Sequence, residues 1–174
     1  MARLFGTDGV RGLANKFPLD GNTVFRIAQL ATRQLMLNHK KQGRPVFIAK
    51  DTRRSGDMLE HVVAAGVASM GAEARLLGVV PTPAVAFVTR ELQGMGGVML
   101  SASHNPFADN GIKIFGPDGY KISDEVEEAI EKELVVGGKT ELPTGREIGF
   151  ISHDDSSASF WLSHLARVAG ENVG

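Results

Sequence analysis

At residues 97–106 the chain reads Gly97-Val98-Met99-Leu100-Ser101-Ala102-Ser103-His104-Asn105-Pro106. The apolar first half predicts a buried strand, and the small and polar second half predicts a loop where that strand ends. In α/β proteins, reactive groups gather at the carboxyl edge of the sheet, where strands give way to loops. We therefore expect Ser103 to be either a turn residue bonded to its own backbone or a nucleophile that carries a covalent group.

Strand-like and helix-like segments alternate on the amino side of this stretch. Helical spacing of apolar positions covers residues 22–42, 55–70 and 81–92, and short apolar runs at 45–49, 73–80 and 96–100 predict strands. We expect Ser55 to cap the second helix with its side chain and Gly71 to end it. This alternation predicts an α/β fold built from crossover units, with a largely parallel sheet.

The pattern changes after Pro106. Asp109-Asn110-Gly111 is a turn signal, residues 112–115 predict a short strand, and a second turn signal at 116–119 indicates an antiparallel edge. Residues 124–136 predict an acidic helix whose carboxylates face solvent. Residues 137–157 have the composition of a connection, and 159–169 predict a last helix.

The composition predicts one soluble globular domain, because the chain has 174 residues, of which 43% are hydrophobic and 22% charged. It contains no cysteine, which excludes a disulfide framework and a thiolate metal site. The N-terminus lacks the apolar core of a secretory signal, and no apolar run approaches the ~18 residues of a membrane span. We expect a cytoplasmic protein with no membrane partner.

Charge is distributed unevenly along the chain. Residues 1–54 carry 11 Lys/Arg and 3 Asp/Glu, whereas residues 55–174 carry 8 and 17. A positive first third would suit an anionic ligand such as a phosphate or a nucleic acid. Arg26, Arg33, Lys40 and Lys41 fall on the first predicted helix, so we interpret them as solvated surface and expect no nucleic-acid partner.

The residues around Ser103 favour phosphate chemistry over acyl transfer. His104 is adjacent, and Lys113 alternates with two isoleucines, so it need not lie in the core. A hydrolase would place its serine in a Gly-x-Ser-x-Gly turn, which is absent, and would need an acid to orient the histidine, which the sequence does not locate. A basic setting suits a phosphorylated serine, because cations stabilise phosphoryl oxygens.

Two further stretches could contact an anion. Residues 5–12 contain three glycines and Arg11, and they form either a backbone cradle for an anion or a structural turn. Residues 50–56 read Lys-Asp-Thr-Arg-Arg-Ser-Gly at a strand end before a helix. There, Arg53 and the helix amides either hold a phosphate, or Asp51 pairs with a basic neighbour in a purely structural role.

Together, residues 5–12, 50–56, 81–86 and 101–115 resemble the α-D-phosphohexomutases, and the resemblance runs from about residue 3 to 136. It implies the first domain of that fold, a three-layer α/β/α sandwich with a mixed, mainly parallel sheet. It also implies an isomerase in which phosphorylated Ser103 gives its phosphoryl group to glucosamine 6-phosphate. The resulting 1,6-bisphosphate would return its other phosphoryl group and leave glucosamine 1-phosphate for cell-wall precursor synthesis.

The same resemblance assigns the site residues. The catalytic set would be Ser103, His104, Lys113 and Arg11, with Arg11 and Lys113 beside the phosphoserine. Lys113 would accept a proton, and His104 would orient or protonate oxygens. Mg²⁺ would be the cofactor, with an oxygen of phosphorylated Ser103 as its metal ligand.

The chain also departs from that family, whose members have four domains in more than twice this length. We expect residues 1–140 to form domain 1 and residues 141–174 to be a connection and closing helix toward an absent second domain. Without the remaining metal ligands and the sugar-reading loops, the chain alone should be inactive. Phe160 and Trp161 replace an expected Arg-Tyr pair and should form an exposed apolar flank through which a dimer could form.

Two other functions stay open. The chain could be the same domain of a phosphomannomutase or phosphoglucomutase, since the loops that choose the sugar are not in it. It could also be a non-catalytic module that uses the fold and its basic loops to bind an anion.

Overall fold

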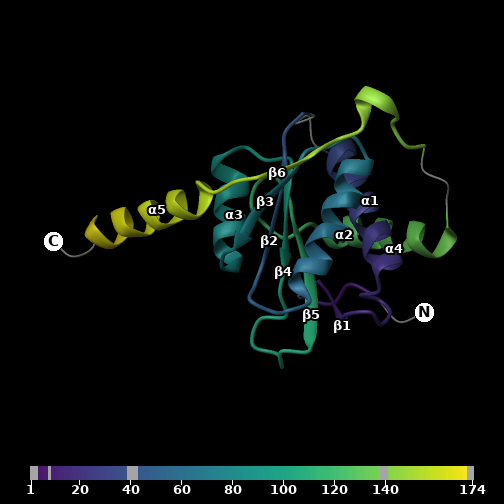
Figure 1. Cartoon of the computed structure of the whole chain (residues 1–174), viewed down its shortest axis with the longest axis horizontal. Coiled ribbons are helices and arrows are strands. Elements are labelled where there is room, and N and C mark those ends of the chain that lie inside the picture. The colour runs from purple at the N-terminus through teal and green to yellow at the C-terminus, as the bar shows by residue number, and fades with distance from the viewer. Residues whose placement is uncertain (1–3, 8, 39–42, 138–140, 172–174) are drawn as a thin grey trace.

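The computed structural model describes residues 4–7, 9–38, 43–137 and 141–171, which form one mixed sheet with helices on both faces (Figure 1). Its strands are β1 (Val10–Leu13), β2 (Val46–Lys50), β3 (Ala74–Val79), β4 (Gly96–Leu100), β5 (Asp109–Phe115) and β6 (Ile151–His153). Its helices are α1 (Gly21–Asn38), α2 (Gly56–Ser69), α3 (Thr82–Glu91), α4 (Asp124–Val136) and α5 (Ser157–Glu171), with a short 3₁₀ turn at Gly145–Glu147.

The strand order is β1-β5-β4-β2-β3-β6. Strands β4, β2, β3 and β6 run parallel to one another, whereas β5 is antiparallel to both β4 and β1. The helices α2 and α3 make the crossovers between parallel strands. The expected mixed, mainly parallel sheet is therefore confirmed, including its antiparallel edge.

The core has two layers, one on each face of the sheet. On one face α1, α2 and α4 cover a large apolar cluster that includes Ile112 and Ile114, and on the other face α3 covers a smaller cluster that includes Met99 and Phe115. Figure 1 shows α3 and the pair α1 and α2 on opposite sides of the strands. Burying each such side chain contributes roughly 1.5–3 kcal/mol. These layers confirm the α/β/α sandwich.

On the antiparallel side one local expectation was wrong and another was incomplete. Asp109-Asn110-Gly111 is not a turn but the beginning of β5, where Gly111 pairs with Arg11. Residues 5–12, expected to be a cradle or a turn, contain a turn in which two backbone hydrogen bonds join Gly6 and Gly9, and β1 begins directly after it at Val10. The long-range pairing of β1 with β5 overrides the local turn preference of Asn-Gly, because each strand supplies the other's ladder partners.

The ends of α2 show one error and one success. Ser55 stands at the N-cap position, but its side chain makes no capping bond to the helix. Its hydroxyl donates instead to the Asn110 side chain. At the other end the chain leaves the helix through Gly71, whose φ of +84° is readily adopted only by glycine. The predicted helix stop is confirmed.

The acidic helix α4 was expected to be a solvated surface, and this expectation is only partly met. Glu127 is only 1% exposed and lies 2.7 Å from the Lys121 ammonium. Glu131 accepts the backbone N–H of Phe5 at 2.6 Å. Carboxylates of α4 therefore hold the N-terminal segment and the chain before the helix, a role that charge patterning alone does not reveal.

The basic residues on α1 are also partly engaged. Arg33 pairs with Glu133 of α4 at 2.5 Å, and Arg26 donates to Gln29 on its own helix. Lys40 and Lys41 lie outside the described residues. Arg33 is a surface residue as expected, with a side chain 40% exposed, but it also joins α1 to α4.

The C-terminal segment adds one strand and one projecting helix. Residues 151–153, expected to be part of a connection, form β6 and extend the sheet beside β3. Helix α5 leaves the body on the side of α3 (Figure 1), and Phe160 and Trp161 pack on Phe87 with ring centroids 5.1 and 5.2 Å apart. Phe160 is 39% exposed, so the neighbouring Leu162, at 62%, is the more exposed apolar side chain on this helix.

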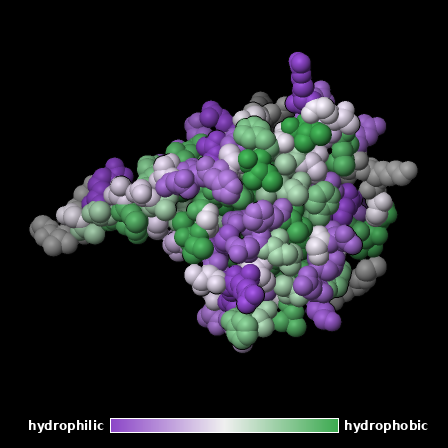
Figure 2. Space-filling view, viewed as in Figure 1, coloured by the Kyte–Doolittle hydropathy of each residue, from purple (hydrophilic) through white to green (hydrophobic). Residues whose placement is uncertain are grey.

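Figure 2 shows apolar and polar side chains interspersed along the projecting α5. The division of the chain near residue 140 stays a prediction, as does a dimer. Within the described residues no helix is both long enough and apolar enough to cross a membrane.

Replacing Gly111 by alanine is expected to destabilise the chain. A Cβ at this position would lie 2.5 Å from the Ser101 carbonyl oxygen, which is backbone and cannot rotate away. Overpacking of this kind costs about 1–3 kcal/mol of the free energy of unfolding, which urea unfolding measures. Gly21→Ala is the matched control, because nothing lies within 4 Å of a Cβ there. Equal losses in the two variants would contradict this explanation.

Candidate functional site

Ser103 lies in the loop that joins β4 to β5, at the carboxyl end of β4. The Ser101 N–H donates to the Gly111 carbonyl at 2.9 Å, and the Ser103 N–H donates to the Ser101 hydroxyl at 2.9 Å. Ser103 itself is exposed and has a φ of +56°. For a residue with a side chain this left-handed conformation costs roughly 1–2 kcal/mol. Contacts from other parts of the fold must therefore hold it.

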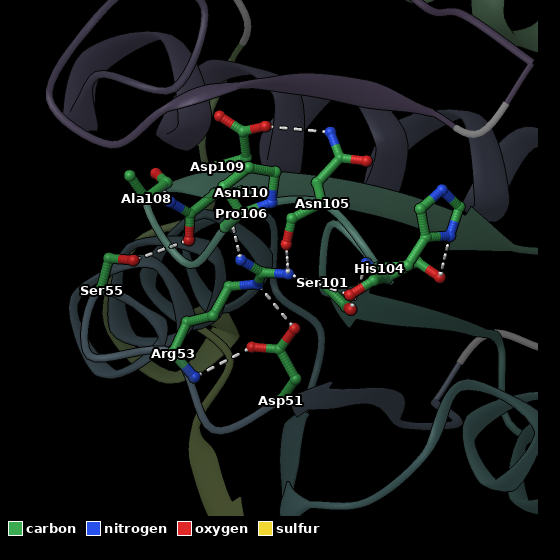
Figure 3. Close-up of polar contacts among 11 residues, drawn as sticks. Asp51, Arg53, Ser55, Ser101, His104, Asn105, Pro106, Ala108, Asp109 and Asn110 are labelled. Carbon is green, nitrogen blue, oxygen red and sulfur yellow. Dashed lines mark hydrogen bonds and ion pairs between the residues drawn. The ribbon is translucent and has the colours of Figure 1, made fainter.

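Arg53 provides those contacts from the chain that follows β2. Its guanidinium donates to the carbonyl oxygens of Ser103 and Asn105, both at 3.0 Å, and to that of Pro106 at 2.5 Å. Figure 3 shows this guanidinium between the loop and Asp51. A hydrogen bond to a charged group contributes about 1.5–3 kcal/mol. One such bond therefore equals or exceeds the strain at Ser103.

Asp51 orients Arg53 from below. Its carboxylate accepts the Arg53 Nε–H at 2.9 Å and the Arg53 backbone N–H at 3.0 Å. The Arg53 side chain is only 10% exposed. Of the two roles considered for residues 50–56, the structure shows the pairing with Asp51, and the guanidinium faces the loop carbonyls.

A second set of bonds anchors the far end of the loop. Asn110 is 3% exposed, accepts the Ser55 hydroxyl at 2.7 Å and donates to the Ala108 carbonyl at 3.0 Å. Within the loop, the Asn105 amide donates to Asp109 at 2.9 Å. Figure 3 shows these side chains around the same turn of chain. The loop is thus braced by both β2–α2 and β5.

The structure places two of the three other expected site residues against this loop. Arg11 in β1 donates to the Asn105 side chain at 3.3 Å. His104 has Nδ1 3.5 Å from the Ser103 hydroxyl, the outer limit of a hydrogen bond. Lys113 is half-buried in β5 opposite Met99, and its side chain makes no hydrogen bond or ion pair to any described residue.

The sequence of the chain matches a known protein family. Residues 2–139 match the model described as phosphoglucomutase/phosphomannomutase, alpha/beta/alpha domain I. The chain belongs to this family. The resemblance seen in residues 5–12, 50–56, 81–86 and 101–115 is thereby confirmed.

Relatives of this phosphoglucomutase/phosphomannomutase domain are considerably longer. A phosphoglucosamine mutase of Syntrophomonas wolfei is 51% identical over 168 residues, which are 95% of this chain and 37% of the relative. One of Syntrophobacter fumaroxidans is 50% identical over 139 residues, 80% of this chain and 30% of the relative. The chain spans about a third of the length of these relatives.

A crystal structure supports the fold. It is of a Thermus thermophilus protein classed as a phosphomannomutase, and it superposes with a TM-score of 0.75 at 32% identity. The match covers 95% of this chain and 36% of that one.

Sequence reasoning missed the polar residues that brace the phosphohexomutase loop. Asn110 was assigned to a turn, and no hydrogen-bonding role was predicted for Ser101 or Asn105. The sequence offers one signal for them, because these polar residues flank an otherwise apolar pair of strands. A buried amide or hydroxyl there is expected to have a hydrogen-bond partner. Which partner it has depends on the tertiary fold.

Among the described residues, no group of three or more acidic or histidine side chains could hold a metal ion. Phosphorylated Ser103 as a ligand of Mg²⁺ therefore stays a prediction.

A buried ion cluster supports the end of β2, next to Asp51. The Lys50 ammonium bonds to buried Glu60 and lies 2.9 Å from exposed Asp57. Burial alone would lower the pKa of Lys50, but the hydrogen bonds to Glu60 and Asp57 outweigh it and raise that pKa above 10.5. The hydrogen bond from Lys50 lowers the pKa of Asp57 below 3.8.

Lys50→Met is expected to lower the free energy of unfolding by about 3–5 kcal/mol at neutral pH, because it leaves the Glu60 carboxylate buried without its cation. The Lys50 contribution is fully present below its unfolded pKa and disappears as pH rises through the raised folded pKa. The Asp57 contribution is present above its unfolded pKa and disappears as pH falls through the lowered folded pKa.

Urea unfolding at several pH values checks this, with exposed Lys132→Met on α4 as the control. The gap between wild type and Lys50→Met should narrow at both pH extremes, while the control stays within about 0.5 kcal/mol of wild type. A gap that stays unchanged as pH rises through the titration of Lys50 would show that the Lys50 charge does not stabilise the fold.

Proposed function

We propose that Ser103 carries the phosphoryl group of a hexose-phosphate mutase and that the reaction interconverts glucosamine 6-phosphate and glucosamine 1-phosphate through a 1,6-bisphosphate. The observation that carries the proposal is an exposed serine held at positive φ on a loop that is braced on both sides. A turn serine needs no such bracing. Relatives at 50% and 51% identity, both named phosphoglucosamine mutase, support the choice of sugar.

The proposed step breaks the bond between phosphorus and the Ser103 oxygen and forms one between phosphorus and a sugar hydroxyl. The sugar hydroxyl proton passes to a base, for which Lys113 is the proposed acceptor. His104, 3.5 Å from the Ser103 hydroxyl, can orient or protonate that oxygen as it leaves. The second half of the reaction returns the other phosphoryl group of the bisphosphate to Ser103.

Cations must balance the charge of the transferring group. Arg11 reaches the loop at Asn105, two residues from Ser103, and is the described cation proposed to face the phosphate. An Mg²⁺ ion on a phosphoserine oxygen would neutralise further charge on the phosphoryl group. In the whole protein this would be a step in cytoplasmic cell-wall precursor synthesis.

A second sugar specificity has its own support. The Thermus structure of the same fold is classed as a phosphomannomutase, and the family description names glucose and mannose phosphates alike. The proposed chemistry at Ser103 is identical in both cases. Comparing kcat/KM of the full-length enzyme on glucosamine 6-phosphate, glucose 6-phosphate and mannose 6-phosphate decides between them, and equal values would remove the proposed preference.

Incubation of the full-length enzyme with glucose 1,6-bisphosphate and Mg²⁺ is expected to add one phosphate, and Ser103→Ala should abolish the addition. Intact-mass analysis measures the adduct, and peptide mapping locates it. Ser159→Ala, which removes an exposed serine on α5 far along the chain, is the control and should keep the adduct. A phosphate that remains in Ser103→Ala would place the carrier on another residue.

A further inference from the structure

The loop around Ser103 turns its carbonyl groups toward a single side chain. Within four residues, the carbonyl oxygens of Ser103, Asn105 and Pro106 all accept hydrogen bonds from Arg53. The first of these carbonyls belongs to the residue with positive φ. Rotation of the Ser103 backbone out of the left-handed region would turn that carbonyl away from the guanidinium. The bond from Arg53 therefore opposes that rotation.

Asp51 leaves Arg53 little freedom to do anything else. It accepts two hydrogen bonds from Arg53, one from Nε and one from the backbone, so the planar guanidinium is fixed in direction. Both of its terminal nitrogens are then bonded to loop carbonyls. These contacts make four hydrogen bonds from a guanidinium that has five N–H groups, so holding a phosphate on Ser103 through two N–H groups would break at least one of them.

We propose that Arg53, oriented by Asp51, is a positioning residue that holds Ser103 in its left-handed conformation and does not bind the transferring phosphate. The inference rests on the proposed function for the role of Ser103. It goes further by assigning a task to a residue whose charge and place suggest a phosphate ligand. Lysine cannot replace Arg53, because a single ammonium cannot serve three carbonyls and the Asp51 carboxylate in one plane.

Arg54 is a natural matched control. It is the next residue and carries the same charge, but it is exposed and makes no hydrogen bond or ion pair to a described residue. Arg53→Lys and Arg54→Lys therefore remove the same chemical group one position apart. Both keep the net charge of the chain.

Amide exchange by NMR on the 174-residue chain tests the positioning. In Arg53→Lys, the amides of Ser103, Asn105 and Asp109 should exchange about tenfold faster or more, and the Ser103 backbone chemical shifts should lose their positive-φ signature. Amides of β2 and β4 should stay protected. Arg54→Lys should match wild type throughout. If Arg53→Lys keeps both the loop protection and the Ser103 shifts, the inference is wrong.

A second comparison, in a Ser103→Gly background, separates loss of positioning from a general loss of stability. Ser103→Gly removes the cost of positive φ, because glycine adopts this region freely. Arg53→Lys should therefore lower the Tm less in a Ser103→Gly background than in wild type. An equal drop in Tm in both backgrounds would mean that Arg53 stabilises the fold without positioning Ser103. If Arg53→Lys does not fold, the milder Asp51→Asn takes its place in every comparison.

The phosphorylation assay separates positioning from phosphate binding. For Arg53→Lys in the full-length enzyme, the maximal rate at which glucose 1,6-bisphosphate phosphorylates Ser103 should fall at least tenfold, with the half-saturating concentration unchanged. A phosphate-binding Arg53 would instead raise the half-saturating concentration, which would overturn the inference. If the wild-type full-length enzyme takes up no phosphate, the proposed function fails, and the exchange measurement still decides whether Arg53 positions Ser103.

Discussion

The bond between the Arg53 guanidinium and the carbonyls of the serine loop is the constraint on which the site depends. It exists because β2 and β4 are adjacent and parallel, so that the chain leaving each strand emerges at the same edge of the sheet. The residues after β2 supply Asp51 and Arg53, and those after β4 supply the loop. The serine loop at the end of one strand is thus held by residues that follow its parallel neighbour, at the carboxyl edge of the sheet.

The antiparallel side of the sheet completes the loop. Strand β5 returns immediately beside β4 and receives β1 from the distant N-terminus, which brings Arg11 to Asn105. Gly111 lets the returning strand approach the Ser101 carbonyl, where any side chain would collide. Residues 10–13 and 109–111, which the local sequence does not predict as strands, are paired strands here, because each supplies ladder hydrogen bonds to the other.

Several charged residues that the sequence places on the solvent-facing surface also hold parts of the fold together. Glu131 and Glu133 of α4 hold the N-terminal segment and α1, and the buried pair of Lys50 and Glu60 supports the end of β2 beneath the site. These contacts connect the outer layer of helices to the edge of the sheet that carries Ser103. The site is therefore coupled to the stability of the whole domain.

The sequence by itself determined the alternating elements, the parallel centre of the sheet and the exposed serine after β4. These follow from local hydrophobic periodicity and from breakers such as Gly71, which act over a few residues. Only the tertiary structure decided that residues 109–111 form a strand, that Ser55 binds Asn110 and that Arg53 faces carbonyls. Each of these joins residues about 50 or more positions apart or depends on burial, and a polar side chain takes the partner that folding brings to it.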